Sequence, residues 1–189
     1  MGPRAWTALE QALQNDREEI ASLLLQAGAD VDAIGARGWR ALHVAARKGN
    51  VNTVKLCLDH GGDINSITDR RQTVLHLACY SGDEATIRLL IDKGSDIEAP
   101  DGRLARPGHI AASNGHESAL RLLFEKGISL EARAGASRRT IQSCAARGSH
   151  FAVVEFLREK RFSPSEGDDG SNTTTTGFHF SGPRLGHHH

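Results

Sequence analysis

The stretch ALHVAARKGNVNTV, residues 41–54, decides the fold because its pattern occurs more than once in the chain. VLHLACYSGDEATI begins 33 residues later at Val74, and PGHIAASNGHESAL begins after another 33 at Pro107. TIQSCAARGSHFAV (140–153) and ALEQALQNDREEIA (8–21) stand in the same frame. A fixed period of this size predicts a solenoid, in which one short unit stacks on the next.

Each unit carries two helical segments. In the first segment, Leu42, Ala45 and Ala46 fall on one side of a short helix, at i, i+3 and i+4. The second segment and the loop after it read LLLQAGADVDA, LCLDHGGDINS, LLIDKGSDIEA and LLFEKGISLEA, again 33 residues apart. We expect glycines to end the helices: Gly49, Gly82, Gly115 and Gly148 the first, and Gly28, Gly61, Gly94 and Gly127 the second. One such hairpin has too little core to be stable alone, so stacked units must bury a shared core.

The unit resembles the ankyrin repeat, whose signature is T-P-L-H-x-A followed by a second helix and a loop containing G-A-D. The best matches are Ala41-Leu42-His43 and Val74-Leu75-His76. The resemblance implies an all-α solenoid of helix-turn-helix units joined by β-turn-like loops. We expect an array over residues 5–162, with units of about 5–34, 35–67, 68–100, 101–133 and 134–162. We expect a leader (1–4) before it and a flexible tail (163–189) after it, in which His187–His189 resemble an affinity-tag remnant.

The recurring histidines have a structural interpretation. In the family, the histidine of the T-P-L-H turn hydrogen-bonds backbone groups of neighbouring loops, and by position this role passes to His43, His76 and His109. The alternative is a ladder of metal ligands. Stacked units are about 10 Å apart, too far for two units to share a metal ion, so we expect no metal site.

Composition excludes several functions. The 23 basic and 23 acidic residues balance, so no global basic field favours nucleic acid. The sequence contains no run of about 18 apolar residues, so it predicts no membrane span. The N-terminus has no secretory h-region. Cys57, Cys79 and Cys144 fall on internal repeat positions, which indicates buried thiols in a reducing compartment, the cytoplasm or the nucleus.

Nothing in the sequence favours catalysis. H-E-x-x-H, C-x-x-C, P-loop and G-x-S-x-G patterns are missing from the sequence. Asp30, Asp63 and Asp96 recur at the loop position where the family has aspartate, which suits hydrogen bonds to local backbone N–H groups rather than acid–base chemistry. We therefore expect a protein that is not an enzyme and has no cofactor.

Three units depart from the repeat pattern, and each departure predicts a local difference in structure or stability. Glu10 stands where other units have histidine, and the polar run after it suits a terminal cap with a wet face. Gly108 replaces Leu42 and Leu75, which predicts a local gap. The fifth unit has Lys160 in place of the closing glycine, so we expect lower stability at this end.

In ankyrin repeats, binding uses the concave surface formed by the loop tips and the exposed side of each first helix. By position, the partner-binding candidates are Arg37, Trp39, Arg47, Lys48, Arg70, Gln72, Tyr80, Arg103, Asn114, Arg138 and Arg147. Many acidic residues fall instead on second helices, which predicts a charge asymmetry despite the balanced total. The alternative is a solvated surface whose charges have no function.

We therefore expect a non-catalytic protein–protein interaction module whose partner presents an acidic or phosphorylated segment. One alternative is a polyanion binder, for nucleic acid or phosphoinositide, with steep salt dependence and little need for Trp39 or Tyr80. Another is a small-molecule enzyme with a pocket in the concavity.

The tail suggests self-interaction. Residues 165–180 contain the acids Glu166, Asp168 and Asp169 and the aromatic residues Phe178 and Phe180. A flexible stretch of about 15 residues reaches roughly 20 Å, enough to return to the last units. The hypothesis is that this segment occupies the concave face, in cis or from a neighbouring molecule.

Overall fold

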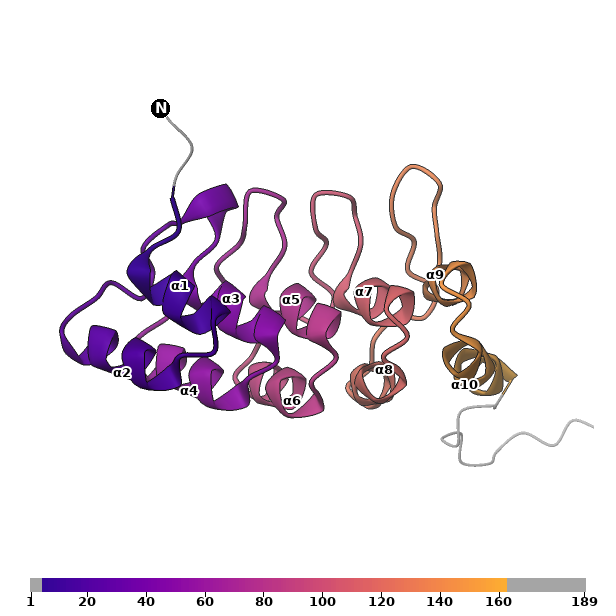
Figure 1. Ribbon diagram of the computed structural model, residues 1–189. Coiled ribbons are helices and arrows are strands. Elements are labelled where there is room, and N and C mark those ends of the chain that lie inside the picture. The colour runs from indigo at the N-terminus through magenta and orange to yellow at the C-terminus, as the bar shows by residue number, and fades with distance from the viewer. Residues whose placement is uncertain (1–4, 163–189) are drawn as a thin grey trace, which may run out of the picture.

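The computed structural model describes residues 5–162, which fold into an all-α solenoid, as the sequence predicts (Figure 1). The first helices of the units are α1 (Ala8–Gln14), α3 (Ala41–Lys48), α5 (Val74–Ser81), α7 (Pro107–Ser113) and α9 (Ile141–Arg147). The second helices are α2 (Glu18–Gln26), α4 (Val51–Asp59), α6 (Glu84–Asp92), α8 (Glu117–Glu125) and α10 (Phe151–Phe162). The two sets form two parallel rows, and long loops extend from the first row to one side (Figure 1). A short 3₁₀ turn, η1 (Ala36–Gly38), lies in the first long loop.

Local side chains start the helices. Thr7 Oγ1 accepts the N–H of Glu10 at 3.1 Å, and Asp83 caps α6 by accepting the N–H of Thr86 at 2.7 Å. Such caps satisfy N–H groups that have no partner within the helix. At the other end, Gly49 closes α3 with a left-handed φ of 69°, a conformation that costs glycine little.

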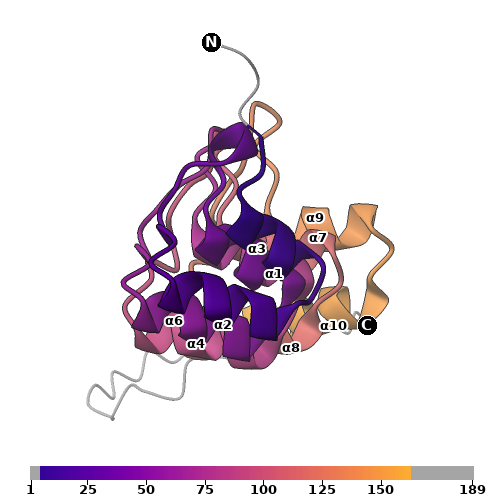
Figure 2. The same ribbon diagram turned by 60° about the vertical axis from the view of Figure 1, so that its left-hand side comes forward.

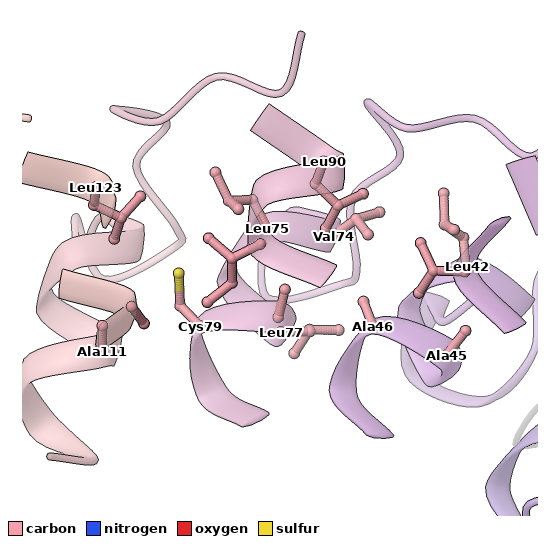
Figure 3. Packing of buried hydrophobic residues seen from close by; sticks show 14 of the residues in the cluster. Leu42, Ala45, Ala46, Val74, Leu75, Leu77, Cys79, Leu90, Ala111 and Leu123 are labelled. Carbon is pink, nitrogen blue, oxygen red and sulfur yellow. The ribbon is translucent and has the colours of Figure 1, made fainter. Parts of the chain in front are cut away.

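The core lies between the two rows and runs the length of the array. Figure 3 shows part of it from close by. Leu75 of α5 is fully buried, with Leu90 of α6 beside it (Figure 3). Small residues at Ala45 and Ala46 allow α3 to approach its neighbours closely. Because each unit shares its buried side chains with the next, removing one of them affects an interface as well as a hairpin.

The three cysteines are free and buried, as expected. Burial raises the pKa of the Cys57 thiol to about 12, and it raises that of Cys79 as well. Both side chains therefore stay protonated and pack as small apolar groups.

The gap predicted at Gly108 does not exist. A Cβ atom at this position would lie 3.0 Å from Ile141 Cδ1 and 3.1 Å from Ile128 Cδ1, so the two isoleucines already fill the space. In the repeat frame, Ile128 stands where other units have Ala29, Gly62 and Ser95. A large side chain at a normally small position thus compensates for a glycine at a normally large one.

The fifth unit is shifted by one residue relative to the 33-residue frame. In the first long loop, the Gly35 N–H donates to Trp39 O. In the fourth long loop, the equivalent Ala134 N–H donates to Arg139 O, one residue beyond the position that corresponds to Trp39. α9 then begins at Ile141, also one residue late.

The same shift changes the turn after α9. Gly148 ends this helix, as expected, but with a φ of −84° instead of the left-handed conformation of Gly49 after α3. The left-handed residue here is Ser149, with φ 56°. Serine thus takes a conformation that glycine adopts more easily, which is unfavourable for the last turn.

Backbone hydrogen bonds join the first three long loops to one another. The Asp69 N–H donates to Arg37 O at 3.0 Å, and the Gly102 N–H donates to Arg70 O at 2.8 Å. Among the residues that the structure describes, no equivalent bond reaches from the loop at 134–139 to Arg103. The fourth long loop is therefore less firmly tied to the array.

We expect the amide hydrogens of residues 137–162 to exchange faster than those of residues 71–99. The fifth unit is shifted, lacks the loop hydrogen bond and, within residues 5–162, packs against a neighbour on one side only. Hydrogen exchange followed by mass spectrometry measures this difference, with residues 41–60 as an internal reference. Equal protection in all three segments would contradict it.

Histidines link neighbouring units at the base of the loops. His43 Nδ1 accepts the N–H of Arg40 at 3.1 Å, and its Nε2 lies 3.2 Å from Ser66 O, to which it donates. His109 makes the corresponding pair, with Nε2 3.1 Å from Ala132 O, and this nitrogen also lies 3.2 Å from Arg139 O. His76 Nε2 uses a different partner, Ala105 O at 3.0 Å in the next long loop. Burial is the main cause that lowers the pKa of all three, that of His43 to about 4.

Glu10 occupies the histidine position in the first unit and is fully buried, whereas the polar run at 14–19 is exposed, as expected of a cap. Its Oε2 accepts the N–H of Thr7 at 2.8 Å, but its buried Oε1 has no hydrogen-bond partner within the described residues. The carboxyl group lies directly against Gly35, where no Cβ would fit. Burial raises the pKa of Glu10, more than its hydrogen bonds to Thr7 lower it.

Glu10→Gln is expected to stabilise the protein at pH 7 by about 1 kcal/mol, because a neutral amide replaces a buried carboxylate with an unpaired oxygen. A raised pKa in the folded state means that Glu10 favours folding in its protonated form, below its unfolded pKa, and that this contribution is lost as pH rises. The gain should therefore shrink toward pH 4. Thermal unfolding at both pH values measures it, with the exposed Glu19→Gln as control. An equal gain at both pH values would contradict this account.

Candidate functional site

The long loops and the first-helix row enclose a groove on one side of the array. In the view of Figure 2 the loops stand together above α1 and α3, away from the second helices. Three hollows follow one another along the groove. The first, of about 480 Å³, lies at units one and two and is lined by Trp6, Gln14, Ala36, Arg37, Trp39, Arg47 and Lys48.

The second hollow, of about 270 Å³, is lined by Arg37, Trp39, Arg47, Arg70, Gln72, Leu77 and Tyr80. We call it the arginine–aromatic hollow. The third, of about 410 Å³, is lined by Asp69, Arg70, Gln72, Asp101, Gly102, Arg103, Ala105, His109, Ile110, Ser113, Ala134, Arg139 and Cys144. We call it the distal hollow. Because Arg37 and Arg70 each line two of the three, the hollows form one continuous groove.

Aromatic side chains hold an arginine at the centre of the groove. The guanidinium carbon of Arg47 lies 4.6 Å from the ring centroid of Tyr80 and 5.7 Å from that of Trp39. Trp39 also contacts Trp6, with 5.9 Å between ring centroids. Such contacts attract the cation to the ring faces and restrict its motion.

The groove arginines have no acidic partners. Within the side chains described, the salt bridges pair Lys48, Arg88, Arg106, Arg121 and Lys126 with carboxylates, at N–O distances of 2.5–3.0 Å. None of these bridges includes an arginine that lines one of the three hollows. The groove therefore carries several arginines without a carboxylate partner among the described side chains.

The two named hollows differ in their acidic residues. No carboxylate lines the arginine–aromatic hollow. Asp69 and Asp101 line the distal hollow, where Asp101 Oδ1 accepts the N–H groups of Arg103 and Ala105 at 2.8 Å each. The attraction for an anion is therefore stronger at the arginine–aromatic hollow than at the distal hollow.

Most of the sequence candidates come together here. Arg37, Trp39, Arg47, Arg70, Gln72 and Tyr80 all line the arginine–aromatic hollow, and Arg103 lines the distal one. Lys48 lines the first hollow, but its ammonium group is paired with Asp16 at 2.7 Å. Asn114 donates its side-chain N–H to Ile110 O at 2.8 Å. Arg138 and Arg147 are exposed and line none of the three hollows.

The structure adds residues that the sequence argument missed. Trp6 stands 33 residues before Trp39, so the repeat frame already contained the signal that would have selected it. Arg139 lines the distal hollow in place of the expected Arg138, because the fifth unit is shifted by one residue. Arg139 Nε is buried and has no hydrogen-bond partner among the described residues.

Comparison with protein-family models agrees with this architecture. A model described as ankyrin repeats (3 copies) matches residues 32–101, one described as ankyrin repeats (many copies) matches residues 108–158, and one described as ankyrin repeat matches residues 5–36. The chain belongs to the ankyrin repeat family. No curated protein matches this ankyrin array. Ankyrin repeats are generally protein–protein interaction modules and are typically non-catalytic.

Two further observations concern the described part of the array. Across residues 5–162, no helix has the length and apolar character that crossing a membrane requires. The same part of the chain contains no group of three or more His, Cys, Asp or Glu side chains placed to hold a metal ion. The tail segment at 165–180, expected to fold back onto the groove, lies outside the described residues, as does the whole of 163–189.

Proposed function

We propose that this ankyrin array binds an acidic or phosphorylated segment of a partner protein in its groove. The observation that carries the proposal is the set of unpaired arginines around the arginine–aromatic hollow, which no carboxylate lines. Arg47 supports it further, because its aromatic contacts hold the cation in place before a ligand arrives. Less side-chain freedom is then lost on binding.

Exposed aromatic residues beside charge favour a protein segment as the ligand. Tyr80 is 47% exposed, although the six residues before it in α5 are buried. Tyrosine, tryptophan and arginine are the residue types that most often anchor protein interfaces. A segment that combines an anionic group with apolar side chains would use both properties of the groove.

The second candidate is a polyanion binder for nucleic acid or phosphoinositide. The same arginines favour it, but Asp69 and Asp101 interrupt the positive surface at the distal hollow. Polyanion binding depends mainly on neutralised phosphates and falls steeply with salt. A protein segment would instead require Trp39 and Tyr80 and respond less to salt.

An enzyme with a pocket in the groove finds less support. In the distal hollow, both ring nitrogens of His109 are engaged with backbone groups, Nδ1 with the Arg106 N–H and Nε2 with carbonyl oxygens. The neighbouring Asp101 already accepts two backbone N–H groups. His109 therefore has no free ring nitrogen for general-base catalysis, and Asp101 Oδ1 is occupied by backbone N–H groups of the loop. The buried, unpaired thiols support a reducing location, cytoplasmic or nuclear.

Selection from a random peptide display library tests the proposal. The purified chain is immobilised, and Arg70→Glu is used in a parallel selection, with Arg88→Glu on α6 as the matched control away from the groove. We expect peptides rich in acidic and aromatic residues that bind the wild type and the control but not Arg70→Glu. Peptides without acidic residues, or peptides that all three proteins retain equally, would contradict it. Ligands that bind Trp39→Ala as well and lose affinity steeply with salt would favour the polyanion candidate.

A further inference from the structure

The arginine–aromatic hollow brings three arginines with free donors to one small space. Within the described residues, the side chains of Arg37, Arg47 and Arg70 form no salt bridge and donate no hydrogen bond. Each guanidinium group carries five N–H donors in a planar fork. The hollow therefore offers a formal charge of three and many unused donors.

A carboxylate matches this arrangement poorly. It has two oxygens and one charge, and the charge of one arginine fork already neutralises it. The other two cations would then remain close together without an anion. A phosphate monoester carries about 1.5 to 2 negative charges at pH 7 and three acceptor oxygens, so it can accept from several arginines at once.

The walls of the hollow suit a side chain that carries its charge at the end of an apolar stem. Leu77 is buried at 3% exposure, and Trp39 and Tyr80 supply ring surfaces. A volume of about 270 Å³ is below the range of typical ligand pockets, about 300–1,000 Å³, and is suited to one side chain rather than a larger molecule.

We propose that the arginine–aromatic hollow binds the phosphate group of one phosphorylated side chain, presented by an extended segment of the partner. This inference rests on the proposed function and specifies its anion. The segment continues into the distal hollow, because Arg70 and Gln72 line both. There Asp69 and Asp101 offset much of the arginine charge, so a second phosphate gains little. A single phosphorylated residue next to neutral residues is therefore preferred over a run of anions.

Fluorescence anisotropy with the full chain tests the inference. The probes are one neutral ten-residue peptide with phosphoserine, phosphotyrosine, glutamate or an unmodified residue at its centre, and a doubly phosphorylated version. We expect at least one singly phosphorylated peptide to bind about ten-fold or more tightly than the glutamate peptide. A second phosphate should change the affinity by less than about three-fold, because the acids of the distal hollow repel it.

Variants assign the binding to the hollow. Arg47→Gln should remove most of the preference for phosphate, and Arg47→Lys should restore little, because lysine lacks the planar fork. Arg88→Gln, which breaks a surface salt bridge with Glu84, is the matched control and should bind as the wild type does. Thermal unfolding of each variant checks that the fold is intact.

Each other outcome has a defined meaning. If the glutamate peptide binds as tightly as the phosphopeptides and Arg47→Gln weakens it, the phosphate inference fails and the proposed function stands. If no anionic peptide binds more tightly than the neutral one, both fail. Vesicles containing a phosphoinositide test the other source of phosphate. Binding to them as tight as to the phosphopeptides, and unchanged in Trp39→Ala, would overturn the assignment to a protein segment.

Discussion

Leu75→Ala is expected to lower the free energy of unfolding by about 2–5 kcal/mol, the range measured when a large buried aliphatic side chain is truncated. Leu75 is fully buried in α5 and packs between the two helix rows (Figure 3). It lies in the central unit, where the cavity would weaken contacts with the units on both sides. Urea unfolding followed by circular dichroism measures the change.

Leu104→Ala provides a matched control for this experiment. Leu104 lies in the third long loop and is 59% exposed, so its truncation should change the unfolding free energy by no more than about 0.5 kcal/mol. An unchanged denaturation midpoint for Leu75→Ala would contradict the stacking of units described above. So would a loss of the same size in both variants.

Lowering the pH from 6.5 to about 4 should destabilise the array, and His43 alone should contribute about 3 kcal/mol. Its pKa falls to about 4 in the folded state, mainly because burial disfavours the charged ring, and the positive charge of Arg40 acts in the same direction. The Ser66 carbonyl and Asp63 oppose this shift. Since the unfolded chain takes up the proton near pH 6.5, stability is complete above that pH and is lost as the pH falls toward 4. His76 and His109 act with the same sign.

The histidine effect can be separated from that of Glu10, which has the opposite sign. We propose to measure unfolding free energies between pH 7 and 4.5 in the Glu10→Gln background, with and without His43→Gln. Glutamine carries no titratable group and keeps a hydrogen-bonding side chain at this position. The slope with pH should be smaller when His43 is replaced. Equal slopes, or no loss of stability on acidification, would contradict the role of this histidine.

The repeat frame predicted the fold because the same physical requirement recurs in every unit. Leu42 and Leu75 hold equivalent buried positions, and the frame identified both from their spacing alone. It failed at Gly108, where Ile128 fills the space from a different position of the unit. A frame that compares equivalent positions cannot reveal compensation between different ones, since that depends on distances in three dimensions.

The sequence predicted which side of the array carries the candidate site, but not which side chains contact one another there. The frame brought Trp39, Arg47 and Tyr80 to one side, and the structure places them in contact. It selected Arg138 where Arg139 lines the hollow, because the helices of the fifth unit begin one residue later than the 33-residue frame predicts. Which arginines lack acidic partners also depends on geometry, since the sequence contains equal numbers of both charges.

The most direct test of the central claim, that the groove binds an anionic protein segment, is a map of the contact surface by nuclear magnetic resonance. The labelled chain is titrated with the tightest-binding anionic peptide, and shifts of the backbone amides and the tryptophan and arginine side chains are recorded. The account predicts that the largest shifts occur at Trp39, Arg47 and Tyr80, with α4, α6 and α8 unaffected. Shifts concentrated on those second helices, or spread evenly over both rows, would contradict it.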